Sequence, residues 1–275
     1  MDRKPSSLRG ALRTLLIVLA VVDLLRAVLF LTQQSWLYSA VGRSIVDPVI
    51  TRQYGIFLLT VALFYALLAR DPERYARLLW VGVAQHATAA VLALNDLIVG
   101  DLSVPVFLVV LMGELLITAA LVVLNSRIHD APWLPGPSTG RLRWMRRIML
   151  GFGVLFVFWA VASTIIIPLG SWLLNYPVID SYTTKQQGIA FLVIGLSSLL
   201  AAADIRRYRI FIWVVISSQA FGCLNSAYEV FVGTIPLSVA FAQWSIQAVI
   251  VASILWLYPW KEAGVSNTAL ATSAS

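Results

Sequence analysis

Two stretches of the sequence, a constant distance apart, decide the fold. The first reads TRQYGIFLLTVALFYALLARDPERYARLLW (Thr51–Trp80), and the second reads TKQQGIAFLVIGLSSLLAAADIRRYRIFIW (Thr184–Trp213). Aligned at an offset of 133 residues and extended to Leu102 and Ile235, the two segments are identical at 16 of 52 positions without a gap. Self-similarity at a fixed interval over this length indicates an internal duplication.

The composition is that of a membrane protein. Of 275 residues, 60% are hydrophobic and only 12% are charged, and the mean hydropathy is +0.85. Soluble domains carry about 25% charged residues, and several apolar stretches here reach the roughly 20 residues that cross a bilayer. These values exclude a soluble enzyme and a disordered chain. The single cysteine, Cys223, excludes an intrachain disulfide.

The apolar segments predict an all-α, polytopic fold with eight transmembrane helices. We expect the spans at about residues 11–31, 54–69, 78–99, 104–125, 148–170, 188–203, 210–233 and 237–258. The corresponding organisation is a cytoplasmic N-terminus at 1–10, a first four-helix repeat at 11–125, a cytoplasmic linker at 126–147, a second four-helix repeat at 148–258, and a disordered cytoplasmic tail at 259–275.

The distribution of basic residues predicts the orientation. If the N-terminus is cytoplasmic, 16 of the 20 Lys and Arg residues fall in segments on the inner side and three on the outer side, with Arg26 inside a span. By the positive-inside rule, this asymmetry predicts that both ends of the chain are cytoplasmic in a bacterial-type plasma membrane. The basic residues follow the topology, so the net charge of +7 is not taken as a sign of nucleic-acid binding.

Each repeat has an even number of spans, so the two repeats enter the membrane in the same direction. We therefore expect a pseudo-two-fold axis along the membrane normal. The second and sixth spans have matching, short apolar segments, Gly55–Ala69 and Gly188–Ala203. To cross the bilayer, their helices must include the polar residues that precede each segment. Paired short segments of this kind indicate a binding site, although a locally thinned bilayer would also accommodate them.

Polar residues near mid-membrane mark a candidate site. His86 lies ten residues beyond Ala76 in the third span, and Glu114 lies ten residues beyond Val104 in the fourth, which enters from the other side. Both are therefore about 15 Å deep, and we expect them to contact each other. The repeat places Gln219 and Gln247 at the matching positions. The pair is either a proton site or a structural bond between helices.

A second set of polar residues is expected nearer the outer surface. Asp96 and Glu229 occupy matching positions at the outer ends of the third and seventh spans, where they either share a cavity or sit as solvated helix ends. Asp23 and Arg26 lie on one face of the first span and are expected to neutralise each other. The second repeat has Trp159 and Ala162 at the matching positions. The remaining candidate ligand-binding residues are Gln53, Gln186 and Asn225, with Asn95 nearby.

Other chemical motifs are missing from the sequence. There is no Cys/His cluster with metal-ligand spacing, no phosphate-binding or dinucleotide-binding glycine loop, and no nucleophile elbow. No cofactor and no metal are therefore expected. Tryptophans near both ends of the spans form an interfacial belt and need no ligand to explain them.

Each half resembles the small four-helix bacterial membrane proteins of the DoxX-like kind. The resemblance lies in TRQYG and TKQQG, which open a helix, and in the segments Arg70–Arg74 and Ala203–Arg207 that follow it. It implies a four-helix membrane unit in each repeat. Because such proteins differ in function, the resemblance implies no catalytic residue.

The sequence favours a polar-lined cavity between the repeats that binds a lipophilic small molecule, such as a quinone, an isoprenoid or another lipid. Acid–base conversion of that molecule would use Asp96, Glu229, Glu114 and His86. A proton-coupled transporter of a small solute is the first alternative, with His86 and Glu114 as the proton site. A structural subunit of a membrane complex is the second. Membrane lipid is the expected partner in each case.

Overall fold

The computed structural model describes residues 5–33, 46–128, 140–167, 179–258 and 260, and these residues form helices and connecting turns without a strand. Eight of the helical segments are long and apolar enough to cross a membrane. The expected class, an all-α polytopic membrane protein, is therefore confirmed. Residues 129–139, which are half of the expected linker, and the expected C-terminal tail apart from residue 260 lie outside the described residues.

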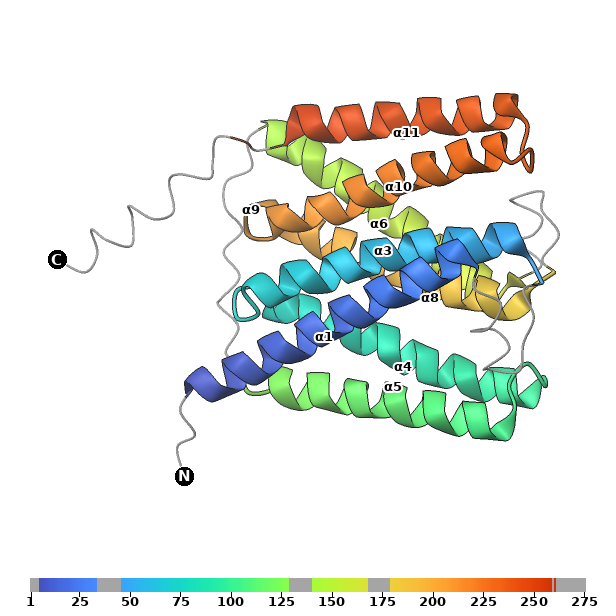
Figure 1. The fold of residues 1–275 in the computed structure, drawn as a ribbon. Coiled ribbons are helices and arrows are strands. Elements are labelled where there is room, and N and C mark those ends of the chain that lie inside the picture. Colours follow the sequence, from blue (N-terminus) through green and yellow to red (C-terminus); the bar gives the residue numbers. More distant parts are fainter. Residues whose placement is uncertain (1–4, 34–45, 129–139, 168–178, 259, 261–275) are drawn as a thin grey trace.

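The helices follow one another along the chain and lie side by side in one bundle (Figure 1). They are α1 (Pro5–Thr32), α3 (Pro48–Arg70), α4 (Ala76–Ile98), α5 (Val104–Asn125), α6 (Gly140–Thr164), α8 (Ser181–Ala203), α9 (Ile205–Tyr208), the 3-10 turn η1 (Arg209–Phe211), α10 (Ile212–Phe231) and α11 (Leu237–Leu257). α6 begins eight residues before the expected span, within the basic segment that was expected to be linker. α3 and α8 do include the polar residues that precede their apolar segments.

Local sequence sets the ends of the helices. Asp47 caps α3, because its carboxylate accepts from the backbone N–H groups of Val49 and Ile50, and Asp180 caps α8 in the same way through Thr183. The chain leaves α4 and α10 through Gly100 and Gly233, whose φ angles of 82° and 78° are left-handed. That conformation is accessible to glycine at no steric cost, so both helices stop there.

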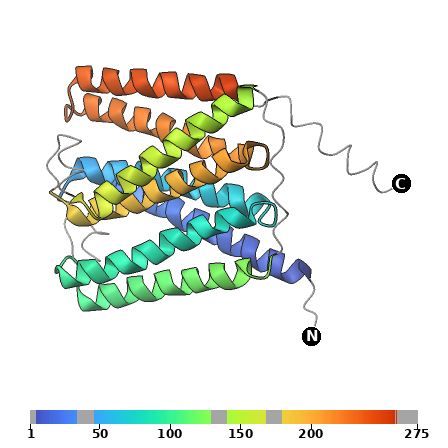
Figure 2. The same ribbon diagram turned by 180° about the vertical axis from the view of Figure 1, so that it is seen from behind.

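The helices pack around a central pair, α3 and α8. α1 packs on α3 and α6 packs on α8, while the α4–α5 hairpin lies against α8 and the α10–α11 hairpin lies against α3 (Figures 1 and 2). In α3 and α8, 67% and 61% of the apolar window is buried, whereas in α5 and α11 only 11% is. The outer two helices therefore leave most of their surface exposed.

The two halves interlock. α4 belongs to the first half of the chain but packs on α8 of the second, and α10 of the second half packs on α3 of the first. Each half thus completes its packing with a helix of the other. The arginines of the connections, such as Arg70, Arg127 and Arg206, gather at one end of the bundle, which we call the basic end (left in Figure 1); the opposite end, with Asp47 and Asp180, is the far end.

Candidate functional site

A buried ion pair joins the two halves at the far end. Arg52, in the second turn of α3, donates through Nε and Nη2 to the two carboxylate oxygens of Glu229 at 2.7 and 2.8 Å. The side chains are only 10% and 2% exposed. The hydroxyl of Thr234 also donates to the Glu229 carboxylate. A bidentate, charge-assisted pair of this kind fixes both distance and orientation between α3 and α10.

A second ion pair joins the halves the other way round. Nζ of Lys185, in α8, lies 2.5 Å from Oδ1 of Asp96 in α4 and 2.9 Å from the side-chain oxygen of Asn95. The carboxylate of Asp101 is 3.6 Å from the same ammonium. Asp96 is fully buried, and the Lys185 side chain is 6% exposed. Arg52 and Lys185 are 133 residues apart, as are Asp96 and Glu229.

These contacts revise the role expected for the outer carboxylates. Asp96 and Glu229 lie inside the described protein as partners of cations, and not as solvated helix ends. The cations that hold them, Arg52 and Lys185, are not among the site residues that the sequence predicts. One feature of the sequence could have indicated these pairs. A basic residue stands at matching positions near the start of the second and sixth spans, and an acidic residue stands at matching positions near the end of the third and seventh.

His86 and Glu114 are in contact, as the depth argument predicted. Nδ1 of His86 lies 2.6 Å from Oε2 of Glu114, and Nε2 lies 3.0 Å from the hydroxyl oxygen of Tyr65. That hydroxyl donates to the side-chain oxygen of Gln85 at 2.8 Å. The two ring nitrogens of His86 therefore bridge Glu114 of α5 and Tyr65 of α3.

Asp23 and Arg26 also contact each other, as expected for residues on one helical face. Nη1 of Arg26 donates to Asp23 at 3.2 Å, and Nη2 donates to the Tyr54 hydroxyl of α3 at 2.7 Å. Asp23 is buried, so a charge that would be costly alone is neutralised locally. Tyr54, Tyr65 and Gln85 belong to this polar region and were missed, because an aromatic or amide residue in a helix gives no signal without its neighbours.

Arg26 and the His86–Glu114 pair line one small cavity. Its polar walls are Arg26, Tyr54, Gln85, His86, Glu114 and Gln186, and its apolar walls are Leu58, Val61, Ala89, Ile189 and Ala190. Helices α1, α3, α4 and α5 of the first half thus face α8 of the second across it. The space open to the centres of water-sized molecules is about 20 Å³, which is room for one water.

The remaining candidate ligand-binding residues are dispersed. Gln219 donates to Ser218 at 3.2 Å, and Gln247 accepts from the thiol of Cys223 at 2.7 Å. Gln53 accepts from Gln187 at 3.4 Å between α3 and α8, and Asn225 is buried in α10. Gln219 and Gln247 therefore hydrogen-bond to nearby residues of the second half, whereas His86 and Glu114, at the matching positions of the first half, are titratable.

The described residues contain no group of three or more His, Cys, Asp and Glu side chains arranged to hold a metal ion. Comparison with known protein families, with curated proteins and with solved structures gives no significant match. The relationship to DoxX-like proteins therefore stays a prediction from the short motifs quoted above.

Proposed function

We propose that the protein is a proton-coupled transporter of a small solute, with His86 and Glu114 as its proton site. The observation that carries this proposal is the position of the pair. It lines the cavity at which helices of the first half meet α8 of the second half, and it brings an imidazole nitrogen within 2.6 Å of a carboxylate oxygen. Intramembrane groups of this type characterise proton relays in pumps and transporters.

The proposal includes a duplicated architecture with a pseudo-two-fold axis along the membrane normal. Packing supports it, because every principal helix contact in one half has a counterpart in the other: α1 with α3 and α6 with α8, α4 with α8 and α10 with α3. Residues at matching positions should touch near such an axis. Tyr75 and Tyr208 do so with ring centroids 6.2 Å apart, and Arg207 donates to the backbone oxygen of Arg74 at 2.8 Å.

A transporter also needs contacts that close one end of the cavity in one conformation and break in another. The two ion pairs at the far end can provide these contacts. Arg52–Glu229 and Lys185–Asp96 both connect one half to the other. A solute can reach the cavity from the far end only if the halves separate there, and separation must break these pairs. Rocking of two repeats about a central site is the usual basis of alternating access.

Acid–base conversion of a lipophilic molecule has less support in this geometry. Two of the four carboxylate and imidazole groups assigned to it, Asp96 and Glu229, are held by cations. The cavity beside the other two has room for one water. A purely structural subunit would use His86–Glu114 only as a bond between α4 and α5, and the experiment below separates that case.

Access to the cavity can be measured without knowing the solute. Ala190 lines the cavity and is buried, so an Ala190→Cys variant in a Cys223→Ser background reports on opening. We expect a membrane-impermeant maleimide to label it at rates that depend on pH, because opening is coupled to the ionisable pair His86–Glu114. Labelling from the two membrane sides should respond to pH in opposite directions. Ser103→Cys, at the exposed far end, controls for reagent access.

Two further variants make the test decisive. Glu114→Gln should abolish the pH response of Ala190→Cys labelling, because an amide does not take up or release a proton as a carboxylate does. Glu229→Gln should speed labelling from the far end, because Arg52 loses its bidentate partner. Labelling that is equally slow at every pH, and unchanged by both substitutions, would overturn the transporter proposal in favour of a structural role.

A further inference from the structure

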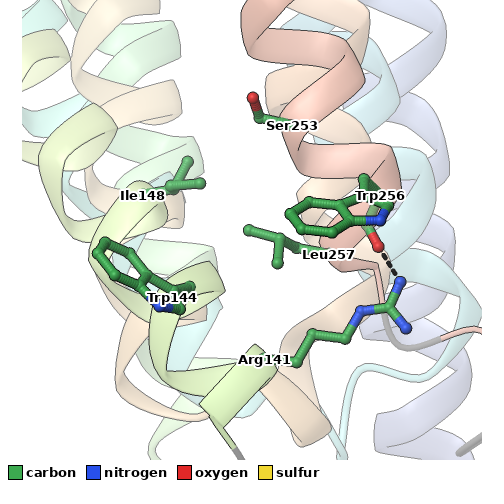
Figure 3. Close-up of a pocket in the computed structure, with 6 residues that line it drawn as sticks. All are labelled: Arg141, Trp144, Ile148, Ser253, Trp256 and Leu257. Atoms are coloured by element: carbon green, nitrogen blue, oxygen red, sulfur yellow. Dashed lines mark hydrogen bonds between the residues drawn. The ribbon is translucent and has the colours of Figure 1, made fainter.

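A groove of about 510 Å³ lies between α6 and α11 at the basic end of the bundle, well away from the polar cavity. α6 contributes Arg141, Trp144 and Ile148 to it, and α11 contributes Ser253, Trp256 and Leu257. Figure 3 shows the two indoles on opposite walls, with Leu257 between them and Arg141 below. α11 buries only 11% of its apolar window, so the groove opens toward lipid.

The walls of the groove match the two chemical parts of a phospholipid. Ile148 and Leu257 offer an apolar surface for an acyl chain. Trp144 and Trp256 are 58% and 76% exposed, and indoles prefer the depth at which acyl chains meet headgroups. The groove therefore has an apolar surface, formed by Ile148 and Leu257, next to two exposed tryptophans that are suited to the depth of the headgroups.

Arg141 supplies a fixed positive charge at the rim. Its Nη2 group donates to the backbone oxygen of Trp256, in the last turn of α11, where carbonyls have no partner within the helix. This bond holds the guanidinium between the two helices. A guanidinium carries several further N–H donors, and α6 begins at Gly140, so the positive end of its dipole lies at the same place.

The surrounding sequence is complementary to an anion. Four arginines fall within residues 141–147, and the sequence has no Asp or Glu between positions 131 and 179. Arg147 lies over the Trp144 ring, with its Cζ 4.9 Å from the centroid. Basic pockets between transmembrane helices are suited to anionic lipid headgroups.

We propose that this groove binds one anionic phospholipid. Its phosphate lies at Arg141 and the N-terminus of α6, and one acyl chain runs along the groove against Ile148 and Leu257. The inference concerns a site separate from the proton site, and it stands whether or not the protein is a transporter.

Native mass spectrometry of the full chain in a mild detergent tests the proposal. Phosphatidylglycerol and phosphatidylcholine with identical acyl chains are titrated separately, and we expect the first bound lipid to be phosphatidylglycerol. Arg141→Gln should weaken that first binding about fivefold, the effect of one basic residue near an anionic surface. Arg143→Gln is the matched control, because Arg143 is exposed on the same helix but does not line the groove.

A second variant leaves all charges in place. Ser253→Trp should fill the groove and remove the first binding event, while Arg141 keeps its bond to α11. Equal losses in Arg141→Gln and Arg143→Gln would show a diffuse surface attraction and overturn the site. Binding that is the same for both lipids, or that persists in Ser253→Trp, would overturn it as well.

Discussion

Removing one member of a far-end ion pair should destabilise the protein strongly. In Lys185→Met the Asp96 carboxylate, which is fully buried, loses the ammonium 2.5 Å away. Breaking a buried pair by removing one partner typically costs about 3–5 kcal/mol, because the remaining charge stays in a medium of low dielectric constant. We expect a loss in that range for Lys185→Met, and a smaller one for Asp96→Leu, since Asn95 and Asp101 still face the ammonium.

Removing both members should restore stability. Lys185→Met combined with Asp96→Leu leaves no buried charge and fills the same space with apolar atoms. Exchanging a whole buried ion pair for apolar residues is often neutral or stabilising by about 1–4 kcal/mol. The double-mutant cycle should therefore give an interaction energy of about 3 kcal/mol or more between the two positions.

The free energy of unfolding is measured by titrating the denaturing detergent dodecyl sulfate into mixed micelles and following tryptophan fluorescence. Arg9 and Glu73 provide the matched control: they are 3.7 Å apart, and their side chains are 52% and 50% exposed. The same cycle there should give at most about 1 kcal/mol. If the Lys185→Met and Asp96→Leu losses simply add in the double variant, the reasoning about a buried, coupled pair is refuted.

Three further substitutions test the packing around the site, with unfolding measured in the same way. Tyr65→Phe removes the hydroxyl that bonds His86 and should cost about 1–3 kcal/mol; a loss near zero would mean that the hydroxyl contributes nothing. Gly188→Leu should disrupt the α6–α8 contact, since even a Cβ there would lie 2.5 Å from the Thr164 methyl group and 3.1 Å from the Ala160 backbone oxygen, whereas Gly113→Leu, with open space around it, should be tolerated. Gly233→Ala should cost about 1 kcal/mol or more, because its φ of 78° is left-handed; a stabilising effect would contradict this.

Sequence patterns could predict the helices and the depth of polar groups along them. Only long apolar segments are stable across a membrane, so the eight spans can be located from the hydropathy along the sequence. Counting residues from the ends of two neighbouring spans placed His86 and Glu114 at one height, and they are 2.6 Å apart. The contact between Asp23 and Arg26 could be predicted in a similar way, because residues three apart lie on the same face of a helix.

Which helices pack against each other could not be predicted from the sequence. The height of Asp96 or Glu229 was evident, but not that α4 packs on α8 and α10 on α3, which brings Lys185 and Arg52 to them. Such partners come from distant parts of the chain and leave no periodic signal near the acidic residue.

The register between the first and fifth spans needed the structure too. A Cβ built on Gly55 would lie 3.1 Å from the backbone oxygen of Ala27, and one built on Gly188 would lie 3.1 Å from that of Ala160. Ala27 and Ala160 are again 133 residues apart. By this contact, the residues at the height of Asp23 and Arg26 are Phe156 and Trp159, and the polar pair still has no counterpart.

The interlocked halves have a consequence for biogenesis. Asp96 emerges from the ribosome 89 residues before Lys185, and Arg52 emerges 177 residues before Glu229. At synthesis rates of about 5–20 residues per second, these charges wait roughly 4–35 s for their partners. During that interval the first half lacks the partners that neutralise Asp96 and Arg52 in the complete fold. A chain that ends before residue 185 therefore lacks the cation that neutralises Asp96 in the finished protein.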